Sequence, residues 1–506
     1  MDTNGRAISR RTFLKRTGAA GSALAAGLVS PQISGEEAQS KPNVLFVFSD
    51  QQRASALGCY PADEDIYTRH FDAFARQGMR FETAISNTPV CCPFRASLMT
   101  GKYGHHNGVV TNQIYPEPGN HPFLAEAFRK AGYTCGYIGK WHLGVVNTDP
   151  GDPRRLGFHD YWCTNLSDSR HRHYAFYIAK DKQIKGECFY RPQFETDRAI
   201  EFIRKQPRTK PWCLFMSWFP PHMPFNSPEK YLARYQDKQV RLHPNVPEGE
   251  AGRYARRFLP HYYGLIEGLD VEFGRLMNEL DSLGLSENTI VVYTSDHGEM
   301  LGAHGLAGKR WPHRDSTDIP FLIRWPKHIQ AGSTLSMPFG TPDMFPTLAG
   351  LAGIDVPAGL DGTDFSSLLL GQFGAEQREW VYIAMHHTYV PWPGWRGVRS
   401  KRYMYARIES EPWLLFDLEN DPFEQRNLVK EKPALVKELD SVLREQMNDV
   451  GDTWRGAQKP GGDWEKWLPG GDKQLHQVCD GDYPGRQIPE VANWRQVVYK
   501  ALSTRS

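Results

Sequence analysis

Two apolar segments with the composition of buried β-strands, residues 44–48 and 290–294, end in side chains that could bind a metal ion. These side chains are Asp50 and Gln51 after the first segment, and Asp296 and His297 after the second. In an open α/β sheet, the carboxyl ends of parallel strands meet at one rim. Carboxylate and amide oxygens with an imidazole nearby suit a divalent cation. Each Asp could instead cap a following helix or turn, so neither strand ending is decisive alone.

A third segment carries a cysteine in a defined context. Residues 89–101 read Pro-Val-Cys-Cys-Pro-Phe-Arg-Ala-Ser-Leu-Met-Thr-Gly, which contains Cys-x-Pro-x-Arg followed by an apolar pair and Thr-Gly. Further motifs are Gly-Lys-Trp-His-Leu-Gly at 139–144, Pro-Pro-His-Met-Pro at 220–224, Asp-His-Gly-Glu at 296–299 with Lys309, and Phe-Asp-Leu-Glu-Asn-Asp-Pro at 416–422. Singly, each motif also fits a buried cysteine, a surface lysine or a core histidine.

Together and in this order, the motifs resemble those of the formylglycine-dependent sulfatases, which belong to the alkaline phosphatase-like superfamily. The resemblance runs from Pro42 to roughly Glu445. It implies an α/β fold with a large mixed, mostly parallel sheet flanked by helices, and a smaller C-terminal α+β subdomain. The activity that it implies is hydrolysis of sulfate esters, on a sulfated carbohydrate in the leading interpretation.

The same resemblance assigns roles to six side chains. A formylglycine-generating enzyme would oxidise Cys91 to formylglycine, whose hydrate supplies the nucleophile. Arg95, one helical turn onward, would hold the formylglycine and sulfate region. Lys140 and Lys309 would clamp sulfate oxygens, His142 would assist formylglycine turnover, and His222 would lie near the leaving oxygen as the acid.

The resemblance also implies one divalent cation, surrounded by Asp50, Gln51, Asp296, His297 and residue 91. Calcium is favoured, with manganese and magnesium as alternatives. The pairing of Asp-Gln with Asp-His is also similar to the phosphonate monoester and phosphodiester hydrolases of the superfamily, which are the alternative function. A glycan-binding protein without catalysis is disfavoured because Cys91, Arg95, Lys140 and His142 are all present.

The elements that would position these residues alternate between apolar runs and helix-period segments, as in parallel α/β folds. Expected strands are 44–48, 133–138, 212–219, 289–294 and 319–324, and expected helices are 71–77, 123–130, 196–205, 263–280 and 341–351. We expect a catalytic domain at 42–370. A C-terminal subdomain at 371–506 would contain a strand at 380–385, antiparallel strands within 395–416, a helix at 433–447 and an irregular extension.

The N-terminus resembles a twin-arginine export signal. Residues 9–15 read Ser-Arg-Arg-Thr-Phe-Leu-Lys and precede a small-residue, weakly apolar stretch. Residues 1–38 are therefore expected to be a signal peptide read by the twin-arginine translocase, with a periplasmic or secreted destination. A disordered basic tail is the alternative. The eight cysteines of the chain are too sparse for a disulfide scaffold, although such a destination would permit one or two bridges.

The composition of the 506 residues limits the possible partners. Sixty Lys and Arg against 58 Asp and Glu give a net charge of +2, which excludes bulk attraction to nucleic acid or an anionic membrane. Beyond the N-terminus, no apolar run is long enough for a membrane span. Two local clusters, Arg-His-Arg-His-Tyr at 170–174 and Trp-Pro-Gly-Trp-Arg at 392–396, favour a polyanionic sugar, or else are solvated loops.

Overall fold

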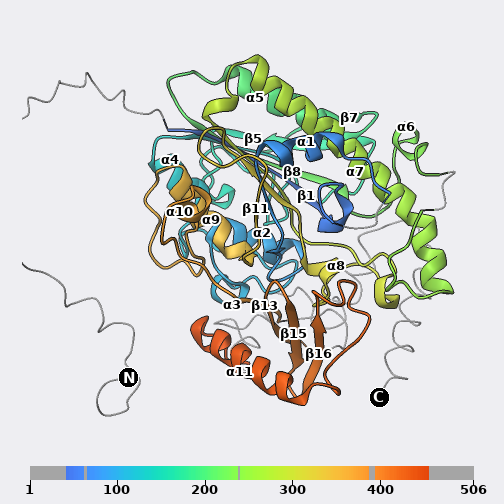
Figure 1. The fold of residues 1–506 in the computed structure, drawn as a ribbon. Helices are drawn as coiled ribbons and strands as arrows, with labels where there is room; N and C mark the ends of the chain where they lie inside the picture. Colours follow the sequence, from blue (N-terminus) through green and yellow to red (C-terminus); the bar gives the residue numbers. More distant parts are fainter. Residues whose placement is uncertain (1–40, 62–64, 237–239, 387–393, 455–506) are drawn as a thin grey trace, which may run out of the picture. The chain divides into compact units, whose positions relative to one another are not determined.

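Strand β1 (Asn43–Asp50) lies inside a ten-stranded sheet whose order is β11-β2-β10-β9-β1-β8-β4-β5-β6-β7 (Figure 1). The computed structural model describes residues 41–61, 65–236, 240–386 and 394–454. The other strands of this sheet are β2 (Met79–Phe81), β4 (Thr134–Lys140), β5 (Tyr161–Asn165), β6 (His173–Ala179), β7 (Lys182–Glu187), β8 (Trp212–Pro221), β9 (Thr289–Ser295), β10 (Phe321–Arg324) and β11 (Ser333–Leu335).

The pairing of the central strands decides where their polar ends lie. β1 runs parallel to both β8 and β9, and β4 runs parallel to β8 and β5. β10 is antiparallel to β9 and β2, and β6 is antiparallel to β5 and β7. The predicted large, mixed and mostly parallel sheet is therefore confirmed. The carboxyl ends of β1, β4, β8 and β9 lie along one edge of it.

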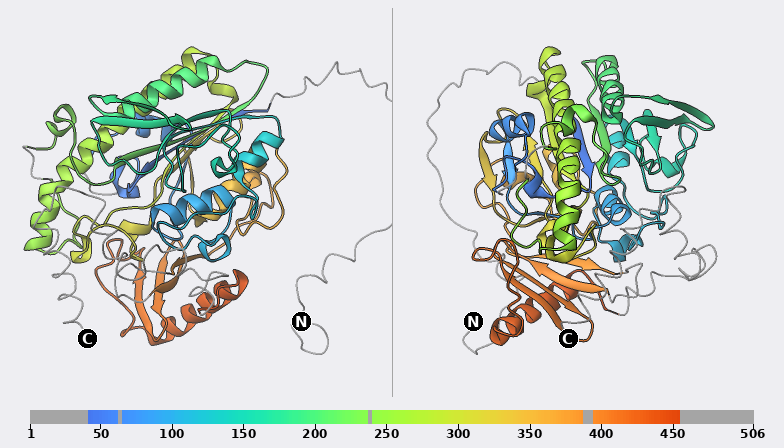
Figure 2. Two further views of the ribbon diagram at one scale, coloured as in Figure 1. Left: turned by 180° about the vertical axis from the view of Figure 1, so that it is seen from behind. Right: turned by 90° about the vertical axis from the view of Figure 1, so that its right-hand side faces the viewer.

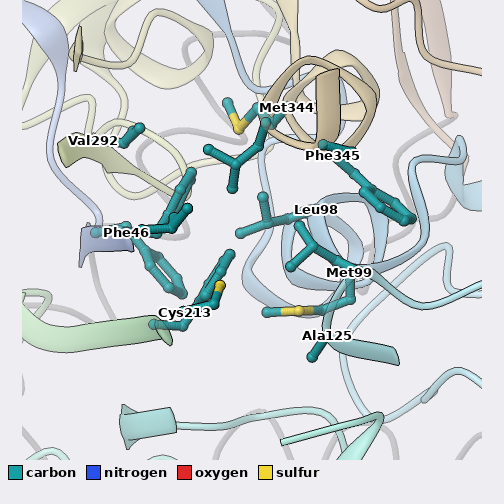
Figure 3. Packing of buried hydrophobic residues seen from close by; sticks show 14 of the residues in the cluster. Phe46, Leu98, Met99, Ala125, Cys213, Val292, Met344 and Phe345 are labelled. Carbon is teal, nitrogen blue, oxygen red and sulfur yellow. The ribbon is translucent and has the colours of Figure 1, made fainter. Parts of the chain in front are cut away.

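Strand β1 is apolar throughout because both of its faces are covered. Phe46 and its neighbours two residues away contribute to one core, which also contains residues of the helices α2 (Cys91–Thr100), α4 (Leu124–Lys130) and α9 (Thr341–Leu351) (Figure 3). Leu45 and Val47 contribute to the other core. Side chains alternate between the faces of a strand, so burial on both faces requires a continuous apolar run.

The second core lies under three helices, α1 (Arg69–Gln77), α5 (Arg191–Lys205) and α7 (Glu250–Ser282), and α7 is the long helix that runs past the sheet in Figure 2. Its buried residues include Leu265, Leu269, Leu276 and Leu280, which recur at helical spacing. The sequence predicted these leucines as core residues, and the structure confirms it. α7 begins 13 residues before the predicted start, at Glu250 rather than at residue 263.

A separate four-stranded antiparallel sheet follows, in the order β13-β14-β15-β16. It comprises β13 (Val381–Met385), β14 (Trp395–Arg399), β15 (Tyr403–Ile408) and β16 (Pro412–Asp417), and α11 (Pro433–Asp449) packs on it. The antiparallel strands and the helix were predicted. Polar contacts join this sheet to the segment between β9 and β10: Arg399 binds Asp318 at 3.1 Å and Trp395 donates to the Arg310 carbonyl at 2.9 Å. The boundary between residues 370 and 371 stays a prediction.

Short or polar elements escaped the sequence analysis. They include the strands β3 (Ala84–Ile85) and β12 (Phe339–Gly340), the helices α3 (Gly104–Asn107), α6 (Glu229–Leu232), α8 (Arg314–Thr317) and α10 (Ser366–Leu369), and the edge hairpin β6–β7. β7 reads Lys-Gln-Ile-Lys-Gly-Glu and is mostly exposed, so it lacks the apolar run that marks a buried strand.

Three sequence predictions fall partly or wholly on residues outside the described ranges. These are the signal peptide at 1–38, the end of the C-terminal extension and Trp392. The cysteines within the described residues are all free, so no disulfide forms there. None of the helices in the described part of the chain combines the length and apolar composition that crossing a membrane requires.

The start of helix α1 is fixed by a carboxylate from another helix. The residue before α1, Thr68, makes no capping bond, but the backbone N–H groups of His70 and Phe71 donate to Asp270 Oδ1 at 2.9 and 2.8 Å. Asp270 on α7 therefore satisfies the N–H groups that a capping residue normally satisfies. Burial raises the pKa of Asp270 to about 7, although both N–H bonds oppose the shift.

This raised pKa gives a pH-dependent prediction. Between about pH 4 and pH 7 the unfolded chain loses the Asp270 proton while the folded protein keeps it, so this residue costs stability as the pH rises. Asp270→Asn has no such cost, so its stability relative to the wild type should improve by on the order of 2 kcal/mol from pH 5 to pH 8.

Urea unfolding at the two pH values measures this difference. Asp270→Ala is the matched control, because it loses the cap and should be destabilised by about 1–2 kcal/mol at pH 5. A relative stability of Asp270→Asn that does not change with pH would contradict the assignment.

Candidate active site

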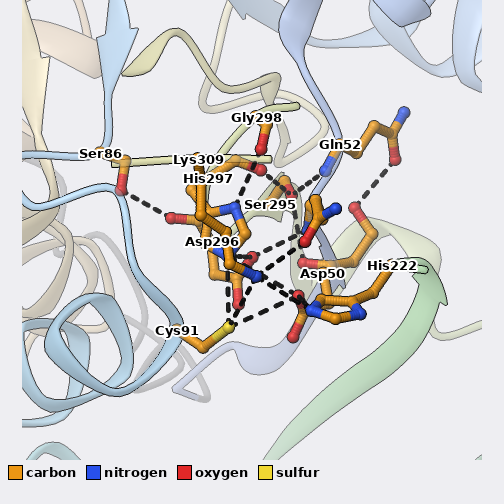
Figure 4. A network of polar contacts seen from close by, with 12 residues as sticks. Asp50, Gln52, Ser86, Cys91, His222, Ser295, Asp296, His297, Gly298 and Lys309 are labelled. Carbon is orange, nitrogen blue, oxygen red and sulfur yellow. Dashed lines mark hydrogen bonds and ion pairs between the residues drawn. The ribbon is translucent and has the colours of Figure 1, made fainter. Parts of the chain in front are cut away.

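The predicted site residues meet at the edge where β1 and β9 end (Figure 4). Asp50 is the last residue of β1, and Asp296 and His297 follow β9 directly. Cys91 is the first residue of helix α2, so it faces these strand ends from the N-terminus of a helix. Asp50, Asp296 and His297 are fully buried, and Cys91 is 1% exposed.

The thiol of Cys91 is the centre of the cluster. Its Sγ lies 3.3 Å from His297 Nε2, 3.7 Å from Asp50 Oδ1, 3.7 Å from Lys140 Nζ and 3.5 Å from Lys309 Nζ. Burial opposes ionisation, but the positive charges of Lys140 and Lys309 and the ring of His297 hold the pKa of this thiol well below its usual range. An anion at this position is therefore electrostatically favoured.

Arg95, one turn along α2, anchors the helix to both strands. Its Nη2 donates to Asp50 Oδ2 at 3.0 Å and to Asp296 Oδ2 at 3.3 Å, and all three side chains are fully buried. Its Nη1 donates to Ser217 Oγ at 2.7 Å and to the Lys140 carbonyl at 2.8 Å. The arginine is thus committed to protein groups rather than directed at the thiol.

Sequence reasoning missed Ser217. It contacts Arg95 from β8 and is fully buried in a strand of apolar and aromatic residues. A single hydroxyl within such a strand was the available signal, because a buried hydroxyl needs a hydrogen-bond partner.

The two predicted lysines reach the thiol from different elements. Lys140, at the end of β4, donates to Asp50 Oδ2 at 2.6 Å. Lys309 follows the loop after β9 and donates to Gln51 Oε1 at 2.7 Å. It also lies 2.9 Å from His222 Nε2. The structure therefore brings both lysines beside residue 91, as the sequence suggested.

The His222 ring has a defined tautomer. Its Nδ1 lies 2.8 Å from the Met223 carbonyl oxygen, which only accepts, so Nδ1 carries the proton and Nε2 accepts from Lys309. Burial and the Lys309 charge lower the pKa of His222 to about 4. The ring is neutral at neutral pH, and the positive charge of the pair resides on Lys309.

The remaining predicted histidine, His142, lies beside the same thiol and interacts with it. Burial and the Lys140 charge lower the pKa of His142 to about 4. The adjacent Cys92 differs from Cys91: its Sγ contacts the His142 carbonyl oxygen at 3.0 Å, and burial raises the pKa of its thiol to about 12. The two neighbouring cysteines therefore have opposite acid–base character.

The donor set at the strand ends fits a divalent cation. The outer oxygens of Asp50 and Asp296 bind Arg95, while their inner Oδ1 atoms lie 3.7 and 3.4 Å from His297 Nε2. His297 Nδ1 lies 3.0 Å from the Gly298 carbonyl oxygen, so Nε2 is the ring nitrogen that faces the carboxylates and could bind a cation through its lone pair. Donor atoms of Asp50, Cys91, Asp296 and His297 all lie within 4.8 Å of one another.

The charges of this cluster support the same fit. Burial raises the pKa of Asp296 above its usual range, and the neighbouring charge of Asp50 adds to that rise. Burial acts the same way on Asp50, but Lys140, His222 and Arg95 hold its pKa well below normal. A cation between the Oδ1 atoms would relieve the repulsion between the carboxylates. Gln51 approaches through its backbone N–H, which donates to Asp296 Oδ1 at 3.0 Å.

A second histidine and aspartate cluster, His105, His386 and Asp452, has the residue types of a metal site. Here the carboxylate is already neutralised, because Asp452 Oδ2 lies 2.6 Å from Arg396 Nε and 3.0 Å from His386 Nε2, and the Tyr382 hydroxyl also bonds it. We assign no metal to this cluster.

The two clusters that the sequence suggested for sugar contact differ in exposure: Arg170, Arg172 and His173 of the first are exposed, whereas Trp395 and Arg396 of the second are buried. His171 is buried against the Pro224 carbonyl at 2.9 Å, and Arg170 is paired with Asp168 at 2.8 Å. Trp395 and Arg396 are buried within β14, so they are neither a solvated loop nor a sugar-binding surface. The two side chains point to opposite faces of β14 and both faces are covered, which the composition did not reveal.

The chain matches two protein-family models. One, described as sulfatase, matches residues 42–354, and the other, described as the C-terminal part of N-sulphoglucosamine sulphohydrolase, matches residues 302–452. Together they span both sheets of the structure.

Individual proteins give the same result. An ulvan-active sulfatase of Formosa agariphila is 36% identical over 432 residues, which cover 83% of this chain and 84% of the relative. An N-acetylglucosamine-6-O-sulfatase of Bacteroides thetaiotaomicron is 26% identical, with 84% and 89% covered. A solved structure from work on the metabolism of multiple glycosaminoglycans by Bacteroides thetaiotaomicron superposes with a TM-score of 0.75 at 25% identity, covering 82% of this chain and 98% of that chain.

The geometry of the donor set predicts the effect of removing one carboxylate. Asp50→Asn should weaken binding of a divalent cation by at least about 100-fold, because a neutral amide replaces a charged oxygen donor. Isothermal titration of chelator-treated protein with Ca²⁺, Mn²⁺ and Mg²⁺ measures this affinity. Asp440→Asn on α11 is the control and should bind as the wild type does. Equal affinity in Asp50→Asn and the wild type would exclude this cluster as the metal site.

Proposed function

Because this chain belongs to the sulfatase family and is a sulfuric ester hydrolase, we propose that it hydrolyses sulfate esters of carbohydrates with formylglycine at position 91. The observation that carries the proposal is the position of residue 91. It begins α2, within 3.7 Å of two lysine ammonium groups and among donors that suit a cation. This arrangement favours an anion next to a side chain that becomes a nucleophile after modification.

Two groups would complete the chemistry. Formylglycine at position 91 would, as its hydrate, offer one hydroxyl as the nucleophile and a second through which sulfate could be released as the carbonyl re-forms, which a thiol does not offer. Asp50, Asp296 and His297, with Gln51 alongside, would hold a divalent cation, which would supply positive charge near the sulfate oxygens and the nucleophile. We favour calcium, with manganese and magnesium as alternatives.

The protein's own residues then bind and orient the substrate. Lys140 and Lys309 lie beside residue 91, where they stabilise negative charge on the sulfate oxygens, and as point charges they need no fixed fork geometry. Arg95 positions rather than binds, because both of its Nη atoms donate to protein groups, among them Asp50, Asp296 and Ser217. His142, neutral and in contact with residue 91, can accept a proton there during turnover.

Protonation of the leaving oxygen falls to His222 and its partner Lys309. In the structure the Lys309 ammonium donates to the unprotonated His222 Nε2, so the two share one mobile proton at the edge of the site. A sugar hydroxyl is a poor leaving group and needs that proton, whereas an aryl oxygen needs much less.

The carbohydrate substrate is proposed from the relatives. One is an ulvan-active sulfatase, and another acts on the 6-O-sulfate of N-acetylglucosamine. The alternative is a phosphonate monoester or phosphodiester hydrolase, which the residue types at Gln51 and His297 favour. Sulfate esters and these phosphorus esters are both tetrahedral anions, so the same lysines and cation would suit either substrate.

We further propose a route for maturation and export. A formylglycine-generating enzyme would modify Cys91 in the cytoplasm, and the twin-arginine translocase would then carry the folded protein to the periplasm or beyond, read from Arg10 and Arg11. Cell fractionation after Arg10→Lys and Arg11→Lys tests this, and an unchanged distribution of the protein would contradict it.

The function itself is tested with a substrate panel. We expect the formylglycine-containing enzyme to hydrolyse sulfated oligosaccharides with a kcat/KM well above that for phosphonate monoesters, and Cys91→Ala to lose nearly all turnover while keeping its fold. Cys92→Ala should retain activity, which makes it the matched control. A higher kcat/KM on phosphonate monoesters would establish the alternative function instead.

The roles of His222 and Lys140 can be distinguished by how the loss of turnover in each variant depends on the leaving group of the substrate. His222→Ala should reduce turnover of sugar sulfates much more than turnover of aryl sulfates, since only the former need protonation of the leaving oxygen. Lys140→Ala should damage both substrates alike, by about 100-fold or more, because it removes a charge from the sulfate oxygens. Equal losses on both substrates for His222→Ala would leave that residue with a positioning role only.

A further inference from the structure

Glu299 lies three residues after Asp296, is fully buried, and has no role in the scheme above. Its recorded hydrogen bonds all come from neutral N–H donors, two from the backbone and one from a side-chain amide. A buried carboxylate is costly unless such bonds satisfy it. These three bonds connect Glu299 to the loop that carries Lys309 and to Gln51.

One oxygen of Glu299 closes the loop that leads to Lys309. Oε1 accepts from the backbone N–H groups of Leu301 at 3.0 Å and Gly308 at 2.7 Å. The backbone N–H of Met300 donates to the Gly308 carbonyl at 2.8 Å beside this closure. Leu301 has a φ of 42°, which a residue other than glycine rarely adopts, and Gly308 has a φ of 73°, which glycine allows. Lys309 is the next residue after the closure.

The other oxygen reaches the same lysine through an amide. Glu299 Oε2 accepts from Gln51 Nε2, and Gln51 Oε1 accepts from Lys309 Nζ at 2.7 Å. A carboxylate only accepts and an ammonium only donates, so this arrangement permits one orientation of the Gln51 amide. Glu299, Gln51 and Lys309 thus form an ion pair bridged by a carboxamide.

We propose that Glu299 is a positioning residue for the sulfatase reaction, which sets the Lys309 ammonium beside residue 91 through both the loop closure and the Gln51 amide. The inference rests on the proposed function, in which Lys309 contacts sulfate. Two distances depend on where the Lys309 ammonium lies: Nζ is 3.5 Å from Cys91 Sγ and 2.9 Å from His222 Nε2.

Glu299→Gln tests this without removing side-chain volume. If the new amide turns its NH₂ towards Gln51, the Gln51 amide must rotate and direct its own NH₂ at the Lys309 ammonium. If it turns its oxygen towards Gln51, its NH₂ faces the N–H groups of Leu301 and Gly308. Either orientation places donor against donor, so Lys309 must leave its position.

The double variant Gln51→Glu with Glu299→Gln restores every partner. The amide at 299 accepts from the two backbone N–H groups and donates to the carboxylate at 51, whose other oxygen accepts from Lys309. If Glu299 contributed only to general stability, the effects of the two single substitutions would add and the double variant would show no rescue of activity.

We expect Glu299→Gln to lower kcat/KM for the sulfated sugar by about 100-fold, as loss of one placed charge at such a site does. The affinity for inorganic sulfate, measured by titration, should fall by about 10-fold. The double variant should recover at least about 10-fold in kcat/KM over the worse single variant. Glu272→Gln, a buried glutamate on α7 that pairs with Arg275, is the control and should retain wild-type kcat/KM.

A crystal structure of Glu299→Gln separates this inference from the proposed function. Lys309 Nζ displaced from residue 91 supports the inference even if the wild type hydrolyses no sulfate ester, which would refute only the function. Lys309 Nζ in its wild-type position overturns the inference, as does a double variant no better than the worse single variant in an active enzyme.

Discussion

The site depends on the ion pairs of the buried Arg95 guanidinium with Asp50 at 3.0 Å and with Asp296 at 3.3 Å. Two carboxylates buried this close repel each other and lose hydration, so a positive partner with fixed geometry is required. Arg95 takes their outer oxygens and leaves the inner ones towards His297 and residue 91. With Lys140 and Lys309 added, three cationic side chains balance the carboxylates of Asp50, Asp296 and Glu299, and a divalent cation would give the site a net positive charge. That balance suits a bound sulfate ester.

The fold makes this interaction possible by bringing together residues that are distant in sequence. Parallel pairing of β9, β1 and β8 places Asp296, Asp50 and the end of β8 along one edge of the sheet. Helix α2 points its first residue at that edge, and its positive N-terminal end further favours negative charge at residue 91. Because Arg95 lies one turn into the same helix, its bonds to the strands also fix the position of residue 91.

The sequence predicted the parts of this site that depend on local pattern. Apolar runs ending in Asp50 and Asp296 indicated strands with a common edge, and the motif around Cys91 indicated what joins them. Contacts that depend on tertiary packing were harder to predict from the sequence. Ser217 was visible only as one hydroxyl in an apolar strand, and Glu299 was part of a motif but had no assigned role. Trp395 and Arg396 were interpreted as a possible sugar-binding cluster, whereas strand β14 buries both. The roles of the residues around Cys91 remain predictions, because proximity does not establish chemistry.

The central claim is that residue 91 acts as formylglycine rather than as cysteine. The most direct test is mass analysis of the peptide that contains residues 91 and 92, prepared from enzyme whose specific activity on a sulfated oligosaccharide is measured on the same sample. The account predicts formylglycine at position 91, unmodified Cys92, and a specific activity that rises in proportion to the modified fraction across preparations. Full activity in protein that carries unmodified cysteine at position 91 would contradict it.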